Sequence, residues 1–507
     1  MEWIAYVVLT LQMALIFCFV FFAFFNCLYG FASLRNPRLR RTPHSGSKIA
    51  VVIVSYNERF VLPETVASCD CLTYSNRVIL LADDSSDLEI VGSLRKMAVS
   101  KGCRRVDLNT SIHDQSQRAV VPSAEPVEIW ESPGFVLLHR NSNVGFKGGN
   151  LREVSKYLRN RGIELMYLLD ADWHPQADCL ERALEVLEAD DHAAFVQTKR
   201  LTFKRDLGLF QRYVTLSEEG CYYVDFEGRQ VLHHPTLFSG CCALLRLSAV
   251  ESVGGFAFGH LTEDLDVSNR LWIAGWRGIY CGDVVNYGEV PFTYNDFRRQ
   301  QERWACGTAR CMRAYFLPIL QSKRLGWLAK LCALRQNAYF ATSLLTAFSI
   351  VQGVATVLWL TLEAGTYPVE YYLSIVQKWQ LPLFVTIYAC VLSNLFGPVI
   401  MVLAKKRQPL DLLHVPMGQW YAYSVLLTYV VGSVKGLLGI KAGWFLTPKF
   451  IRGQLGVRPN RQRKMRLMNA GICVVLLLSY SLEGWAFGWR DPFALLLIPA
   501  FVLAVRE

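Results

Sequence analysis

The sequence predicts an α/β domain built on a parallel sheet flanked by helices, joined to helices that cross a membrane or lie on it. Three observations lead to this fold class. Short β-branched runs alternate with helix-like stretches in the middle of the chain, acidic residues follow two of these runs, and the apolar residues gather towards both ends. A chain of 507 residues, 52% of them hydrophobic, has room for one such domain and several membrane spans.

Four apolar runs in the middle of the chain are typical of strands. They cover residues 48–54, 78–87, 135–140 and 165–175, and helix-like stretches such as 149–162 separate them. Strands that alternate with helices form parallel sheets with helices on their faces. In such folds the ligand lies beyond the carboxyl ends of the strands. No G-x-G-x-x-G motif opens a helix and the sequence contains no P-loop, so neither of these phosphate-binding devices is available.

Acidic residues stand where two of the predicted strands end. Asp83 and Asp84 follow the second run, and Asp170 and Asp172 follow the fourth as a D-x-D pair. Two carboxylates one residue apart offer oxygen ligands to a hard divalent cation, and Mg²⁺ or Mn²⁺ held in this way also binds a diphosphate. A solvated turn is the alternative interpretation of a D-x-D pair alone, because acids often end strands.

A third acidic segment lies within residues 259–278. Thr262 is a plausible N-cap, and the acids that follow it suit the first turn of a helix. Capping alone would explain this pattern. A carboxylate at such a helix end can also point into a cleft and act as a general base.

The N-terminal apolar run is long enough to cross a bilayer. Residues 4–31 contain no charged side chain, and residues 35–48 carry five Lys and Arg residues and no acid. A cleaved signal peptide is the alternative, but the run has no basic leader and no small-residue cleavage site. The basic segment indicates that this side faces the cytoplasm and that the N-terminus lies outside.

The cysteines do not suggest a metal site. There are 15 of them, and Cys69 and Cys71 form a C-x-C pair without a matching second pair. In a reducing compartment such residues are small core side chains more often than disulfide partners.

Four motifs together resemble the membrane-type family 2 glycosyltransferases, the cellulose synthase and hyaluronan synthase superfamily. They are "ADDSSD", "DAD", "TED" and "QQERW", in the family's order. The segments "SYNE", "NVGFKGGNLRE", "FSGCCALLR" and "SVGGF" are also similar to family segments. The resemblance covers residues 48–316 and looks closest to the mannan and glucan synthase-like branch. It implies a GT-A domain with a Rossmann-like sheet.

The resemblance implies a role for each matching residue. Asp264 would be the general base that takes the proton from the acceptor hydroxyl, so that the anomeric carbon is inverted. Asp170 and Asp172 would hold the metal, Mg²⁺ or Mn²⁺. The residues implied to bind the nucleotide sugar are Tyr56, Glu58, Asp83, Asp84, Lys147, Asp170, Gln300 and Arg303. Glu263 and Trp304 would bind the acceptor.

The Q-x-x-R-W group lies on a predicted amphipathic helix that Asn295 can cap. One stripe of this helix is largely apolar and the remainder carries several arginines. An interfacial anchor is one interpretation, because Trp and Arg suit the headgroup region. In the family, Gln300, Arg303 and Trp304 line the acceptor site, with the Trp stacked on the terminal sugar.

The C-terminal half contains more span candidates. Residues 338–362 and 381–404 are expected to cross the membrane, with an external loop between them. Residues 409–440 are expected to lie in the interface. Basic residues precede them at 405–407, and residues 441–466 carry eight Lys and Arg residues and no acid, so both sides are expected in the cytoplasm. One span cannot join two cytoplasmic segments, and the stretch is too short for two spans. The segment "WFLTPK" resembles the family's gating loop, F-x-V-T-x-K, with Trp and Leu as departures. Its implied gating residues are Trp444, Phe445, Thr447 and Lys449.

The expected organisation has six parts and five spans, the last two at 467–486 and 491–505. The parts are an anchor (1–34), a cytoplasmic GT-A domain (35–293), interfacial helices (294–336), two spans (337–404), a cytoplasmic interfacial helix with the gating loop (405–466) and two more spans (467–507). The protein is therefore expected to be a multi-pass protein of the plasma or inner membrane, with its catalytic domain in the cytoplasm.

The expected function is that of a processive polysaccharide synthase that exports its product. UDP-glucose is the expected donor and a growing β-glucan the acceptor, with GDP-mannose and a donor of N-acetylglucosamine as rivals. The lipid bilayer is the expected environment, and no nucleic acid is expected as a partner. A non-processive transferase that makes a glycolipid is the main alternative. A transporter or scaffold with an inactive domain is a third.

Overall fold

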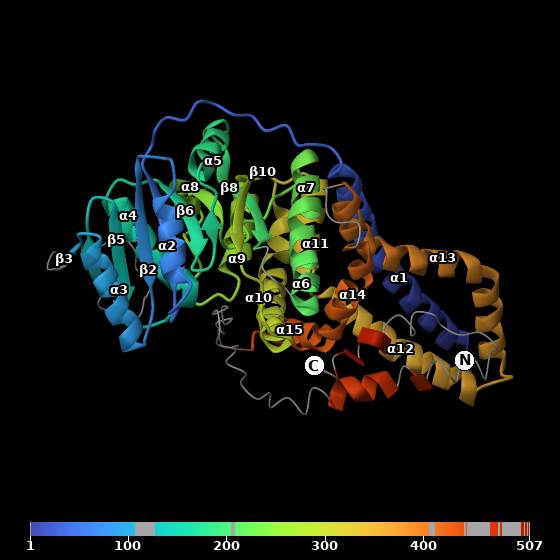
Figure 1. Cartoon of the computed structure of the whole chain (residues 1–507). Helices are drawn as coiled ribbons and strands as arrows, with labels where there is room; N and C mark the ends of the chain where they lie inside the picture. Colours follow the sequence, from blue (N-terminus) through green and yellow to red (C-terminus); the bar gives the residue numbers. More distant parts are fainter. Residues whose placement is uncertain are drawn as a thin grey trace.

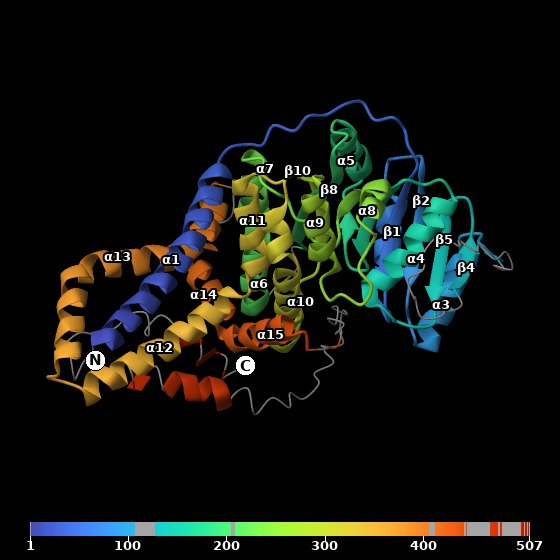
Figure 2. The same cartoon turned by 180° about the vertical axis from the view of Figure 1, so that it is seen from behind.

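The computed structural model describes residues 2–106, 127–203, 208–404 and 411–440, together with Gly443 and short pieces between 467 and 505. The α/β domain and the long apolar helices lie side by side (Figure 1). Helices α9 (Glu263–Ala274) and α10 (Tyr294–Gln321) lie between them in both views (Figures 1 and 2). The acidic motif of α9 and the Q-x-x-R-W group of α10 therefore lie where the two parts meet.

One sheet of ten strands forms the centre of the domain, in the order β3-β4-β5-β2-β1-β6-β9-β8-β10-β7. The strands are β1 (Ile49–Ser55), β2 (Arg77–Asp83), β3 (Arg104–Val106), β4 (Val127–Glu131), β5 (Phe135–Arg140), β6 (Leu165–Asp170), β7 (His174–Pro175), β8 (Ala193–Thr202), β9 (Ala243–Arg246) and β10 (Arg277–Gly288). The four central strands β5, β2, β1 and β6 are parallel, as expected. The sheet as a whole is mixed, because β9 runs antiparallel between β6 and β8.

The central strands are apolar along their whole length because helices cover both faces. Alternate residues of β1 point to opposite sides: Val51 and Ile53 belong to one buried cluster, and Ala50 and Val52 to the other. The covering helices are α2 (Leu62–Asp70), α3 (Leu88–Ser100), α4 (Phe146–Asn160), α5 (Cys179–Glu188) and α8 (Leu247–Ser252), with α9 at one end.

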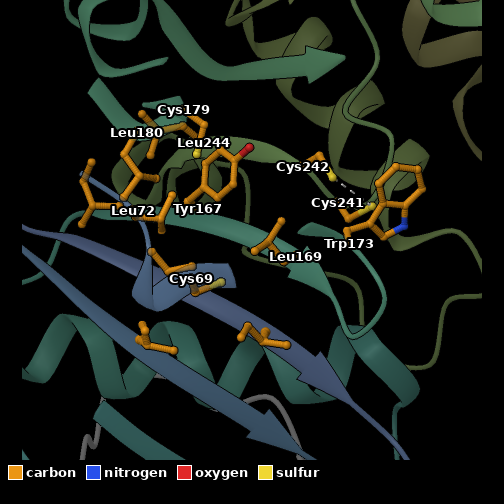
Figure 3. Close-up of a cluster of buried hydrophobic side chains, with 14 of the residues drawn as sticks. Cys69, Leu72, Tyr167, Leu169, Trp173, Cys179, Leu180, Cys241, Cys242 and Leu244 are labelled. Atoms are coloured by element: carbon orange, nitrogen blue, oxygen red, sulfur yellow. Dashed lines mark hydrogen bonds between the residues drawn. The ribbon is translucent and has the colours of Figure 1, made fainter. Parts of the chain in front are cut away.

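Several cysteines pack in this core, as predicted from the sequence. Cys69, Cys179, Cys241 and Cys242 are fully buried in the cluster that Figure 3 draws, among leucines, Tyr167 and Trp173. All 15 cysteines are free thiols, and the described part of the chain contains no cluster of three or more side chains able to hold a metal.

A second group of helices joins the sheet to the apolar region. These are α6 (Leu209–Gly220), the π-helix η1 (Cys221–Phe226), α7 (Glu227–Val231), α10 and α11 (Trp327–Ala338). The expected cap at Asn295 is wrong: α10 begins two residues earlier, and the hydroxyl of Thr293 accepts a bond from the backbone N–H of Asp296. Asn295 therefore lies inside the first turn.

The apolar helices are α1 (Glu2–Ala32), α12 (Thr342–Leu362), α13 (Tyr367–Ala404), α14 (Asp411–Ser424) and α15 (Leu426–Leu438). Among the described residues, α1 and α12 are long and apolar enough to cross a membrane. Helices α14 and α15 meet at a bend of 45°, and together they would make a third span if the bent pair crosses as one unit. The loop expected between 362 and 381 is largely helical instead. Val369 and Tyr372 of this stretch pack against Ala5 of α1, which gives the helix an apolar surface to bury.

Helix α15 packs tightly on α10 through two glycines. A Cβ atom at Gly432 would lie 2.7 Å from the carbonyl oxygen of Glu302, and one at Gly436 would collide with the carbonyl of Cys306. Lys435, between them, forms an ion pair of 2.6 Å with Glu302. Small residues at this spacing let two helix backbones approach closely.

The segment between α1 and β1 runs over the outside of the domain (Figure 1). Arg41 forms ion pairs with Glu185 at 3.3 Å and with Asp283 at 2.6 Å. The backbone N–H of Ser45 donates to Glu188 at 2.7 Å. The segment is therefore fastened to α5 and β10 along its course.

Candidate active site

The carboxyl ends of the central strands meet at one edge of the sheet. The register pairs Ser55 with Asp83 and Val54 with Asp170, so the last residues of β1, β2 and β6 lie level with one another. The first residue of α9 lies near this edge, because Lys147 donates to Asp170 and lies 4.0 Å from Glu263. The strand-end acids and the acidic helix motif are therefore brought together, as the sequence predicts.

The two acids that end β2 are paired with two bases that end the neighbouring strand β5. Asp83 accepts hydrogen bonds from the hydroxyl and backbone N–H of Ser85, and its Oδ2 lies 2.8 Å from Nδ1 of His139. Asp84 accepts from Nε of Arg140 at 2.7 Å and from Asn150 at 2.8 Å. Both carboxylates are almost completely buried.

These pairs shift the protonation of their members. Burial raises the pKa of Asp84 to about 6, against the opposing hydrogen bond and charge of Arg140. Burial acts to lower the pKa of His139, but the hydrogen bond and charge of Asp83 outweigh it and the pKa is raised. The pairs hold the turn after β2 rigid, and the assignment of Asp83 and Asp84 to the nucleotide stays a prediction.

The loop after β1 is docked onto this turn by Asn57, which the sequence reasoning did not single out. Asn57 has a φ of 52°, and its backbone N–H donates to the hydroxyl of Ser85 at 2.8 Å. Its side-chain oxygen accepts from the backbone N–H groups of Ser86 and Asp87. Tyr56 and Glu58 flank this residue and are thereby held at the strand edge.

Lys147 lies at the centre of the site. Its ammonium donates to Oδ1 of Asp170 and to the carbonyl oxygen of Gly240 at 2.8 Å, and it lies 4.0 Å from Glu263. Burial acts to lower the pKa of Lys147, but the charges of Asp170 and Glu263 outweigh it and raise the pKa. The prediction that Lys147 lies near the D-x-D pair is confirmed.

The start of α4 places Lys147 through the glycines beside it. A Cβ atom at Gly148 would collide with the carbonyl oxygen of Ala257, and the N-cap Gly145 has a φ of 77°. This close approach between α4 and the segment before α9 explains why the motif "NVGFKGGN" contains these glycines.

The D-x-D carboxylates fit a hard divalent cation with few protein ligands. Asp172 is buried, whereas the side chain of Asp170 is 38% exposed and faces the ammonium of Lys147. The carboxylate of Asp170, the more exposed of the two, therefore already binds one positive charge, the ammonium of Lys147. Mg²⁺ is commonly bound by one or two carboxylates with substrate phosphates completing its shell. Asp170 and Asp172 would hold such an ion together with a diphosphate.

Glu263 and Asp264 begin helix α9. Thr262 occupies the N-cap position, but its side chain makes no capping hydrogen bond. Burial and the neighbouring Asp264 raise the pKa of Glu263 to about 7. Burial also raises the pKa of Asp264, against the N–H of Leu265 and the charges of Lys147 and Arg303.

Gly240 brings Asp264 to Lys147. Its φ is +86°, and a Cβ atom there would lie 3.0 Å from Oδ2 of Asp264. Its carbonyl oxygen is the acceptor for Lys147. One glycine therefore contacts the residue expected to act as base on one side and the ammonium on the other.

Arg303 of α10 faces the same acids. Burial lowers the pKa of Arg303, and the charges of Glu263, Asp170 and Asp264 oppose this effect. Gln300 and Trp304, on the same helix, are half-buried. Helices α9 and α10 meet closely here, because a Cβ atom at Gly307 would lie 2.5 Å from Thr262. The structure thus brings Arg303 near the acidic motif, and its expected contact with the diphosphate stays a prediction.

Two expectations are not addressed by this geometry. Trp444, Phe445, Thr447 and Lys449 of the expected gating loop lie outside the described residues. The positions of Gln300 and Trp304 are described, but their contacts with a sugar stay predictions.

An apolar cavity of about 340 Å³ lies elsewhere, against α1 and α11. It is lined by Phe21, Phe24, Phe25, Leu28, Leu232, His234, Trp327, Leu328 and Leu331. Among these residues only His234 and the indole N–H of Trp327 are polar, and none is charged like the groups that bind a nucleotide's phosphates.

Part of this chain is similar in sequence to known proteins. A family model described as "Glycosyl transferase family group 2" matches residues 165–404. A probable glucomannan 4-beta-mannosyltransferase 9 from Oryza sativa subsp. japonica is 29% identical over 293 residues, which cover 57% of this chain and 50% of that protein. Glucomannan 4-beta-mannosyltransferase 2 from Arabidopsis thaliana is 28% identical over 280 residues, 54% of this chain and 47% of that protein. The chain spans about half the length of these relatives.

One similar solved structure is a mannosyltransferase from Pyrobaculum calidifontis in complex with GDP-Man and Mn²⁺, with 17% identity and a TM-score of 0.49. That likeness covers 85% of this chain and 100% of the other. The family match, the mannosyltransferase relatives and the mixed sheet with its strand-end acids agree with one another. Residues 165–404 of this chain therefore match a family 2 glycosyltransferase domain.

Proposed function

We propose that this protein is a membrane-bound, inverting hexosyltransferase that extends a β-linked polysaccharide from a nucleotide-sugar donor. The relatives are named as mannosyltransferases of glucomannan, which favours GDP-mannose over the UDP-glucose expected from the sequence. The observation that carries the proposal is the convergence of Lys147, Arg303 and the acids Asp170, Glu263 and Asp264 at one edge of the sheet.

The cationic side chains suit the leaving group. Negative charge develops on the departing nucleoside diphosphate, and Lys147 and Arg303 offset this charge from two different helices. A divalent ion held by Asp170 and Asp172 would supply further charge neutralisation at the phosphates. Burial raises the pKa of Glu263, so this side chain carries less negative charge at neutral pH than an ordinary glutamate and competes less with the diphosphate for the two cations.

Asp264 suits the role of general base. It lies at the start of α9, and its Oδ1 accepts from the N–H of Leu265 at 2.8 Å. This bond fixes the carboxylate and leaves Oδ2, beside Gly240, for the acceptor hydroxyl. Removal of that proton makes the oxygen a nucleophile. A single displacement at the anomeric carbon then inverts its configuration.

The apolar helices support action at a membrane. Helix α10 carries Arg303 and Trp304 and packs on α15, directly beside the helices long enough to span a bilayer. We propose that the catalytic domain is cytoplasmic, that the N-terminus lies outside, and that the product is exported as it grows. The five-span topology and the gating loop at 444–449 are part of this proposal.

The test is to incubate the purified protein, reconstituted in lipid nanodiscs, with single radiolabelled donors: GDP-mannose, UDP-glucose and UDP-N-acetylglucosamine. We expect a product from GDP-mannose that stays at the origin of a paper chromatogram and is degraded by a β-mannanase. The Asp264→Asn variant is the control. A product that organic solvent extracts would indicate a glycolipid and contradict the polymerase. No product from any of the three donors would contradict the transferase itself.

A further inference from the structure

A buried arginine outside the predicted site contacts the loop on which that site depends. Arg200 lies on β8, and its Nη1 donates to Sγ of Cys241 at 3.1 Å and to the carbonyl oxygen of Ser239 at 3.4 Å. Its Nη2 donates to Glu218 of α6 at 3.2 Å. One guanidinium thus reaches both the 239–241 loop and the helix that precedes the π-helix.

Two aromatic rings hold the guanidinium in place. Its central carbon lies 5.0 Å from the ring centre of Trp173 and 5.1 Å from that of Tyr222. Trp173 directly follows Asp172, and Tyr222 belongs to the π-helix η1. Figure 3 shows Trp173 beside Cys241 and Cys242 at the edge of the core. Arg200 is therefore enclosed by segments that also carry candidate active-site residues.

The 239–241 loop connects the two halves of the candidate site. The carbonyl oxygen of Gly240 accepts from Lys147, and a Cβ atom at Gly240 would lie 3.0 Å from Oδ2 of Asp264. The ends of the loop are fixed from one side by Arg200. The hydroxyl of Tyr222 also donates to the hydroxyl of Ser239 at 3.1 Å. A shift of this loop would change the distance between the ammonium and the carboxylate.

Stability alone does not account for an arginine at this position. Its Nε is buried and has no hydrogen-bond partner among the residues that the structure describes. A buried N–H without a partner costs free energy, whereas an apolar side chain of similar length would fill the space without that cost. Departures of this kind are expected at functional sites.

We propose that Arg200 is a positioning residue that holds the 239–241 loop and thereby sets the placement of Lys147 relative to Asp264. The inference rests on the proposed function. We expect Arg200 to affect the rate of transfer and not the affinity for the donor. The reason is that Arg200 contacts the 239–241 loop and contacts neither Lys147 nor Arg303, the two side chains expected to bind the diphosphate. The planar fork suits this position, because one of its nitrogens reaches Ser239 and Cys241 and the other reaches Glu218, whereas a lysine offers all its donors from one compact nitrogen.

The experiment compares Arg200→Met and Arg200→Lys with Arg246→Met as the matched control. Arg246 lies on the adjacent strand β9, donates to the carbonyl oxygens of Ala193 and Leu187, and stands at the opposite edge of the sheet. For each variant we would measure kcat, donor Kd by titration calorimetry, and Tm. We expect Arg200→Met to lower kcat on the order of 10²-fold with an unchanged donor Kd. Arg200→Lys should recover part of that loss, and Arg246→Met should lower Tm alone.

A second measurement reports on the loop itself. We expect Arg200→Met to increase labelling of Cys241 by a thiol reagent, followed by mass spectrometry, with no increase at Cys179, which lies in the same core. An unchanged kcat or unchanged labelling of Cys241 in Arg200→Met would overturn the positioning role, and so would a higher Kd with an unchanged kcat. Absence of transfer by the wild-type protein from any donor would overturn the proposed function and this inference with it.

Discussion

Lys147, near the start of α4, donates a hydrogen bond to the carboxylate of Asp170 at the end of β6. The same ammonium donates to Gly240 and lies 4.0 Å from Glu263. A single cation thus neutralises the more open member of the D-x-D pair and contacts the acidic helix motif. A divalent ion and a diphosphate bound at Asp170 would therefore lie beside this ammonium.

Removal of divalent metal should abolish sugar transfer. The described residues near the D-x-D pair provide two carboxylates for an ion, so the substrate's phosphates would have to complete its shell. We expect EDTA to abolish activity, and Mg²⁺ or Mn²⁺ to restore it. Asp172→Asn should require a higher metal concentration for half-maximal activity. Full activity in the presence of chelator would contradict the assignment of Asp170 and Asp172.

The variant Asp264→Asn should lose transfer and keep donor binding. Loss of a general base costs about 10²–10⁴ in rate. The matched control is Asp266→Asn, on the same helix. Asp266 accepts hydrogen bonds from Arg270 and Tyr315, so its role is to stabilise the fold. The control should lower Tm with a much smaller change in kcat. Equal turnover of wild type and Asp264→Asn would remove Asp264 from the mechanism.

Stability should depend on pH through Glu263. Its pKa rises from an ordinary value of 4.5 to about 7 in the folded protein, so the folded state binds more protons than the unfolded state between these values. Stability therefore falls as pH rises from 4.5 to 7 and changes no further above that range. We expect the Tm of Glu263→Gln, measured in EDTA, to exceed that of wild type by a margin that grows across this window. A margin that does not vary with pH would contradict the raised pKa.

Enlarging a glycine between α10 and α15 should disturb the acceptor side of the site. Gly436→Ala places a methyl group against the backbone of α10, and such overpacking typically costs about 1–3 kcal/mol. We expect a lower Tm and a higher KM for the acceptor, because α10 carries Trp304. Gly353→Ala on α12, where a Cβ atom would meet nothing within 4 Å, is the control and should change neither. Normal acceptor kinetics in Gly436→Ala would separate α15 from the site.

The membrane topology can be tested with single cysteines in an otherwise cysteine-free variant. Residues 441–466 carry eight basic side chains, which favours the cytoplasm. We expect a cysteine near Thr366 to react with a membrane-impermeant maleimide in intact cells. A cysteine near Gly453 should react only after the cells are opened. Labelling near Gly453 from outside would refute the gating-loop assignment and favour the glycolipid alternative.

The strands and their acids were predictable because burial on both faces leaves continuous apolar runs with abrupt polar ends. Strand β9 was not, since four residues after a turn carry no periodic signal, and its antiparallel direction depends on tertiary pairing. The stretch 367–380 was expected to lie in an external loop because it contains few Lys and Arg residues. Such a charge bias indicates the side of a membrane, but it does not indicate whether the backbone is helical. Its packing on α1 decides that.

The sequence predicted which motifs belong to the candidate site, but it did not predict which of their side chains contact one another. Spacing in the sequence does not indicate that Arg303 meets Glu263, or that Gly240 separates Lys147 from Asp264. The pairing of His139 with Asp83 could have been suspected, because "HR" ends one predicted strand as "DD" ends another. Arg200 gave no signal, since an arginine in a strand usually points to solvent and its burial depends on Trp173 and Tyr222.

The segment that joins α1 to β1 limits how far the α/β domain can move away from α1. A free linker of that length would let its ends vary in separation with a root-mean-square distance of about 20–24 Å. Here Arg41 and Ser45 fasten it to α5 and β10. Only residues 33–40 of the segment then remain between α1 and the first of these contacts, so the distance over which the domain and α1 can separate is much shorter than for a free linker.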